Sequence, residues 1–210
     1  MTTEKYDPQA ERWTETAYAD ADAYLAHRAE LVVSLGPRLL PGEVVLDLAC
    51  GDGGLGEHLL ARGLRYRGTD ASAAMVEAAR QRLGARAPVD VGDLNAYAPP
   101  EPAAATTVFR AIYYADDREA FFRRAAAFTE RKLVFDLNPR QFPLETVLAE
   151  LRRAGWEHVA LRPFLFPQRH SPPRPLRPLL AAAERSGPLA RLALRRRFTY
   201  LVAASSGTNP

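Results

Sequence analysis

The feature that most constrains the fold of this chain is an apolar run that leads directly into a cluster of glycines. Residues 43–49 read EVVLDLA and residues 50–56 read CGDGGLG. A short apolar run of this kind predicts a buried strand, and the glycines let the backbone approach a ligand closely. Residues 55–62 then predict a helix, whose first N–H groups face the loop and favour negative groups. The unit predicts a binding site for an adenosine-bearing cofactor.

Predicted strands and helices alternate along the chain as far as residue 162. Strands are expected at residues 43–49, 66–69, 89–91, 106–113, 132–137, 156–162 and 197–203. Helices are expected at residues 8–35 (one or two helices), 55–62, 72–83, 116–128 and 142–154. This alternation is typical of an α/β fold, in which helices cover both faces of a mostly parallel sheet.

The length of 210 residues suggests a single domain, residues 1–210. We divide it into an N-terminal helical lid (1–36), a cofactor-binding core (37–162) and an insert (163–196) before the last strand. The insert is rich in proline and arginine, and no helix of ordinary form is predicted in it. Its arginines favour a solvated lid, and its leucines and alanines also allow an amphipathic cover over the acceptor pocket. Contact with an anionic membrane surface is an alternative, and contact with RNA phosphates is a weaker one.

The composition is that of an ordinary globular protein, with 47% apolar and 25% charged residues and a net charge of +3. The only cysteine is Cys50, which fits a reducing compartment. We see no secretory signal and no apolar run that approaches the ~20 residues of a membrane span. A cytoplasmic location is therefore expected. The scattered histidines and the single cysteine lack ligand spacing, so no metal site is expected.

Three aspartates indicate which adenosine-bearing cofactor the glycine loop binds. The GDGGLG stretch at residues 51–56, followed by Asp70, satisfies the dinucleotide pattern, so a nicotinamide-dependent oxidoreductase is one alternative. Asp47, however, lies four residues before Gly51. A carboxylate so close would repel a pyrophosphate but would tolerate a cationic or zwitterionic ligand. Asp93 ends the third predicted strand, where it could reach an adenine amino group.

Three segments carry a family resemblance: VLDLACGDGGLGEHL at residues 45–59, YRGTDAS at 66–72 and VGDL at 91–94. Together they resemble the class I S-adenosylmethionine-dependent methyltransferases, and within them the branch that methylates small molecules and lipids. The likeness covers about residues 40–137. It implies a Rossmann-like, seven-stranded, mostly parallel sheet with an antiparallel last strand and helices on both faces.

The resemblance also implies roles for individual residues. Asp47 would face the amino group of the methionine part of S-adenosylmethionine, Asp70 would bind the ribose hydroxyls, and Asp93 would bind the adenine amino group. The full set of implied cofactor-binding residues is Asp47, Ala49, Gly51, Gly53, Asp70, Ala71, Met75, Asp93, Leu94, Arg110 and Ala111.

Candidates for the acceptor side follow the fourth and fifth predicted strands or lie in the lid and the insert. As catalytic residues we select Tyr113, Tyr114 and His170, and as substrate-binding residues Tyr6, Trp13, Asn138 and Arg140. Ordinary packing explains the aromatic residues equally well. A base is needed only if the acceptor arrives protonated.

The chain lacks the Asn-Pro-Pro-Tyr motif that often accompanies methylation of an exocyclic or amide nitrogen, so oxygen or carbon is favoured as the methylated atom. The expected function is S-adenosylmethionine-dependent methyl transfer to a small organic or lipid-like acceptor. An RNA methyltransferase and a non-catalytic S-adenosylmethionine-binding protein are further alternatives.

Overall fold

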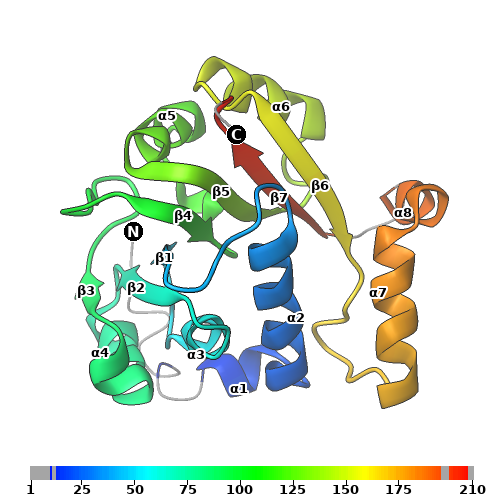
Figure 1. The fold of residues 1–210 in the computed structure, drawn as a ribbon, viewed down its shortest axis with the longest axis horizontal. Coiled ribbons are helices and arrows are strands. Elements are labelled where there is room, and N and C mark those ends of the chain that lie inside the picture. The colour runs from blue at the N-terminus through cyan, green and yellow to red at the C-terminus, as the bar shows by residue number, and fades with distance from the viewer. Residues whose placement is uncertain (1–9, 11–12, 195–198, 208–210) are drawn as a thin grey trace.

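A seven-stranded sheet forms the centre of the structure, a computed structural model whose described residues are 10, 13–194 and 199–207 (Figure 1). The strands are β1 (Val44–Leu48), β2 (Arg65–Asp70), β3 (Val89–Val91), β4 (Ala103–Val108), β5 (Thr129–Leu137), β6 (His158–Phe164) and β7 (Thr199–Ser205). Their spatial order is β3-β2-β1-β4-β5-β7-β6. Only the two pairs that include β7 are antiparallel. The predicted fold class is therefore confirmed.

Helices cover both faces of the sheet, because the strands are apolar on both sides. The helices are α1 (Trp13–Ala17), α2 (Ala21–Ser34), α3 (Gly54–Leu60), α4 (Ala73–Leu83), α5 (Arg118–Phe128), α6 (Leu144–Arg153), α7 (Arg177–Arg185) and α8 (Gly187–Leu194). Val45 packs into the core beneath α2, α3 and α4. Leu46 and Leu48 pack into the core beneath α5 and α6. Successive residues of a strand point to opposite faces, so β1 contributes to both cores.

The fourth strand ends five residues earlier than the 106–113 predicted from the sequence. It stops at Val108, and Arg110 adopts a left-handed backbone conformation with φ of 55°. The Arg110 N–H donates to Asp136 Oδ1 on β5 at 2.7 Å. This side-chain contact replaces the next step of the strand, and the sequence pattern gives no sign of it.

The insert contains helices, which corrects the expectation that it has none of ordinary form. Helices α7 and α8, coloured orange in Figure 1, lie beyond the β6 edge of the sheet, and α7 contacts α2. Pro178 lies in the first turn of α7. A proline is tolerated there because the first helical N–H groups have no helical acceptor. No helix in the described part of the chain is long and apolar enough to cross a membrane.

Polar contacts join the insert to the N-terminal helices. Glu184 of α7 is buried, and its carboxylate lies 2.7 Å from His27 Nε2 on α2 while it also accepts the Leu165 N–H at 2.7 Å. Gln168 donates to the Ala17 carbonyl at 3.0 Å, and Arg177 pairs with Asp20. These contacts hold the insert against α1 and α2.

Lys132 of β5 holds the end of α2. The side chain is completely buried, and its Nζ donates to the carbonyl groups of Val33 and Leu35 at 3.2 and 2.7 Å. The last carbonyls of a helix have no partner within the helix. Burial lowers the pKa of Lys132 from 10.5 to about 7.

This pKa predicts a rise of stability with pH. Below pH 7 the ammonium is charged in both states, so the cost of burying the charge is fully present. Between about pH 7 and 10 the unfolded chain keeps the proton and the folded chain releases it. The free energy of unfolding should rise there by up to about 1.4 kcal/mol per pH unit. Denaturant titrations over this range should show the rise, and Lys132→Met should abolish it. The exposed control Arg123→Met should keep it, whereas equal profiles for wild type and Lys132→Met would contradict the prediction.

Candidate active site

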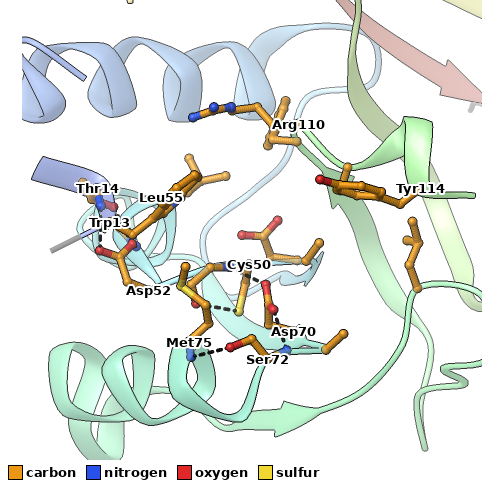
Figure 2. A pocket seen from close by; sticks show the side chains of 18 of the residues that line it. Trp13, Thr14, Cys50, Asp52, Leu55, Asp70, Ser72, Met75, Arg110 and Tyr114 are labelled. Atoms are coloured by element: carbon orange, nitrogen blue, oxygen red, sulfur yellow. Dashed lines mark hydrogen bonds between the residues drawn. The ribbon is translucent and has the colours of Figure 1, made fainter. Parts of the chain in front are cut away.

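One pocket lies beyond the carboxyl ends of β1, β2 and β4, where open α/β sheets bind their ligands (Figure 2). Most of the residues selected from the sequence line it. They are Trp13, Asp47, Ala49, Gly51, Asp70, Ala71, Met75, Asp93, Leu94, Arg110, Ala111, Tyr113 and Tyr114. Lid, glycine loop and strand ends thus meet around a single cavity.

The glycine loop has an unusual backbone. Ala49, Gly51 and Gly53 all have positive φ, at 58°, 58° and 75°. Ala49 has a Cβ, so the left-handed conformation costs this residue about 1–2 kcal/mol. Gly53 begins α3 and does not line the pocket. A Cβ there would lie 3.0 Å from the Leu83 side chain, so packing as well as conformation favours glycine.

Asp47 is a buried carboxylate in the floor of the pocket. Its Oδ2 accepts from the Tyr66 hydroxyl at 2.8 Å and its Oδ1 from the Thr107 hydroxyl at 2.6 Å. Burial raises the pKa of Asp47 to about 6, against the lowering effect of these two hydrogen bonds. A carboxylate has about four acceptor positions, so Asp47 can still accept from a ligand ammonium group.

Asp70 connects the loop to the next helix. Its two oxygens accept from the Gly51 N–H and the Ser72 N–H, each at 2.9 Å. Burial raises the pKa of this carboxyl group, and the backbone hydrogen bonds oppose the rise. Ser72 in turn caps α4 by accepting from the Met75 N–H at 3.2 Å. Asp93 is exposed at the rim of the pocket. The three predicted aspartates thus all lie around this pocket.

Arg28 of α2 is a pocket residue that the sequence analysis missed. It is only 2% exposed, and its guanidinium group lies 4.4 Å from the centre of the Phe109 ring and 3.6 Å from Asp136 Oδ2. Burial lowers the pKa of Arg28, but the surrounding tyrosines and Asp136 outweigh it and raise the pKa overall. Its Nε has no hydrogen-bond partner in the described structure. The available signal was its spacing, three residues after Leu25 and four before Val32, on the apolar face of the helix.

Asp52, also missed, fastens the lid to the glycine loop (Figure 2). Its carboxylate accepts from the Thr14 N–H at 2.9 Å and from the Thr14 hydroxyl, and Arg82 Nη2 of α4 donates to it at 2.9 Å. A Cβ on Gly54 would collide with the Thr14 hydroxyl. The second half of the glycine run therefore makes room for the lid as well as for a ligand.

Several selected residues lie elsewhere. His170, Asn138 and Arg140 are exposed and do not line the pocket. Asn138 Oδ1 instead accepts from the Arg140 N–H at 3.1 Å and stabilises the turn after β5. The geometry thus gives no support to an acceptor or catalytic role for these three. Tyr6 lies outside the described residues.

Comparison with known proteins gives a domain match and a fold. Residues 45–132 match the family described as methyltransferase domain. A chain of the Haloferax volcanii complex that contains the Trm112 methyltransferase activator is 19% identical, with a TM-score of 0.67 over 97% of this chain and 98% of that chain. No curated protein sequence matches significantly.

Two further solved structures cover nearly the whole chain. The TehB-like S-adenosylmethionine-dependent methyltransferase from Corynebacterium glutamicum is 20% identical, with a TM-score of 0.63 over 97% of this chain and 99% of that chain. The magnesium protoporphyrin IX methyltransferase from Synechocystis, solved with bound S-adenosylmethionine, is 15% identical, with a TM-score of 0.61 over 98% and 92%.

The residues around the pocket suit this cofactor. A buried carboxylate and a buried guanidinium group can face the two charged ends of an amino acid, and Asp70 ends β2 where a ribose can be bound. The domain match covers the strand, the glycine loop and all three aspartates. Residues 45–132 therefore carry a methyltransferase domain, with S-adenosylmethionine as its methyl donor, within a fold that solved S-adenosylmethionine-dependent methyltransferases share.

Proposed function

We propose that the enzyme methylates a small organic or lipid-like acceptor, at oxygen or carbon. The observation that carries this proposal is the group of aromatic side chains that lines the pocket around Arg110. Trp13 and Tyr18 from the lid face Arg110, while Phe109, Tyr113 and Tyr114 follow β4. A cavity with such walls suits a small, partly apolar molecule more than an extended polymer. The similar Synechocystis enzyme is likewise named for a small-molecule acceptor.

The charges around the pocket support one orientation of the cofactor. Asp47 and Arg28 both line the pocket, and each charge favours the ionised form of the other. We assign the methionine amino group to Asp47 and the methionine carboxylate to Arg28. Asp70 is assigned to the ribose, and Asp93 with Leu94 to the adenine. When bound, the cofactor supplies an activated methyl group, and the protein has to orient the acceptor and exclude water.

A labelling experiment separates the acceptor classes. The enzyme is incubated with methyl-labelled S-adenosylmethionine and, separately, with a small-molecule extract, transfer RNA and cell protein. Label is expected in the small-molecule fraction and absent with Asp70→Ala, because that variant lacks the ribose ligand. Label in the RNA at a comparable rate would favour the RNA methyltransferase alternative and contradict the proposal.

The assigned role of Asp47 predicts a pH dependence of cofactor binding. The ammonium group needs an ionised partner, and the pKa of Asp47 is about 6. The affinity for S-adenosylhomocysteine should be constant above that pH and fall by about tenfold per pH unit below it. Calorimetry between pH 5 and 8 measures this. Asp47→Asn should bind weakly with a flat profile, and a flat profile for the wild type would refute the role.

Exposed leucines and arginines of the insert support the proposal that the enzyme rests on an anionic lipid surface. Leu176, Leu179, Leu189 and Leu192 are between 47% and 63% exposed. In α7 and its preceding turn, and again in α8, the two leucines are three residues apart and so share a side of the helix. The same segment carries exposed arginines at positions 169, 174 and 185. Leucines beside arginines are typical of segments that rest on an anionic bilayer.

Co-sedimentation with vesicles tests this contact. Binding to phosphatidylglycerol-containing vesicles is expected, with little binding to pure phosphatidylcholine. The double substitution Leu179→Gln and Leu189→Gln should reduce it at least fivefold. The control Leu40→Gln changes an exposed leucine outside the insert and should have no effect. Equal binding to both kinds of vesicle, or by the double variant, would exclude the contact.

A further inference from the structure

Arg110 is a cation in the pocket that the assigned cofactor contacts leave unused. Its backbone adopts φ of 55° and is held by Asp136. A positive φ is uncommon for a long side chain and costs of order 1 kcal/mol. This conformation is accompanied by a side chain that extends across the pocket, opposite Asp70 and Ser72 (Figure 2).

The surroundings of the Arg110 guanidinium group are aromatic. Its central carbon lies 5.2 Å from the centre of the Trp13 ring and 5.8 Å from that of Tyr18. No carboxylate in the described part of the chain lies within ion-pair distance of it, and its buried Nη1 has no hydrogen-bond partner there. Asp136 accepts from the Arg110 main-chain N–H and pairs with the Arg28 guanidinium group, not with that of Arg110.

Such an environment is costly for a cation. A guanidinium group carries five N–H donors in a planar fork. A hydrogen bond to Tyr18 favours the charged form of Arg110, but burial disfavours it and the buried Nη1 has no partner in the described structure. Arg28 is a like charge nearby, and it acts unfavourably on the charged form of Arg110. The bound cofactor adds a sulfonium cation to the same cavity. An anion that entered the pocket would offset both repulsions and provide a partner for the guanidinium group.

We propose that Arg110 binds an oxyanion of the methyl acceptor, so the acceptor is an acid that carries a carboxylate or a phosphate group. Both groups match the arginine fork with two parallel hydrogen bonds. The rings of Trp13 and Tyr18 lie close to the guanidinium group and would reduce the access of water to the ion pair. The inference rests on the proposed function, in which Arg28 binds the methionine carboxylate and Arg110 is therefore available to the acceptor.

The test is calorimetry on the enzyme saturated with S-adenosylhomocysteine, with benzoate, phenyl phosphate and the neutral benzamide as probes. At least one of the two anions should bind ten times more tightly than benzamide, and the better one identifies the acidic group. Arg110→Gln should remove this preference and change the affinity for S-adenosylhomocysteine by less than threefold. The control Arg140→Gln, at an exposed position outside the pocket, should keep the preference.

Two results would overturn the inference. One is that neither anion binds more tightly than benzamide, which includes the case in which none of the three probes binds. The other is a large loss of S-adenosylhomocysteine binding in Arg110→Gln, which would assign the guanidinium group to the cofactor. A wild-type enzyme that does not bind S-adenosylhomocysteine would refute the proposed function itself, so the two failures are distinguishable.

Discussion

The hydrogen bond between Asp70 and the Gly51 N–H, with the left-handed backbone of the loop, is the constraint on which the rest of the pocket depends. It closes the loop against β2, and a second bond from the Cys50 N–H to the Thr69 carbonyl at 3.0 Å does the same. The loop held in this way places Asp52 where Thr14 can reach it. The position of the lid is therefore a consequence of the loop conformation, although the two segments are 38 residues apart.

The pocket separates opposite charges. Asp47 lies in β1, Asp70 ends β2 and Asp93 follows β3. Arg28 and Arg110 instead come from α2 and from the loop after β4. A zwitterionic, cationic cofactor fits between the two sets, with its ammonium group toward an acid and its carboxylate toward an arginine. On this proposed arrangement one arginine serves the cofactor and the other remains for the acceptor. The charged residues around this one pocket would then determine both the orientation of the cofactor and the charge of the acceptor.

Sequence reasoning predicted the parts of the structure that depend on local pattern. The β1 strand, the glycine loop, the Ser72 cap and the end of α4 at Gly84 all follow from residues close together in the chain. It failed where a distant side chain decides the outcome. Asp136 ends β4 early, Asp52 receives the lid, and Arg28 enters the pocket from a helix far from the motif. The helices of the insert were missed because its prolines indicated a break, yet Pro178 lies in a first turn.

A crystal structure with S-adenosylhomocysteine tests the central claim, the orientation of the cofactor between these charges, most directly. We predict the ribose at Asp70, the amino group at Asp47 and the carboxylate at Arg28, with the Arg110 guanidinium group free of contact with the cofactor. A carboxylate bound to Arg110, or an amino acid end directed away from Asp47, would contradict the account.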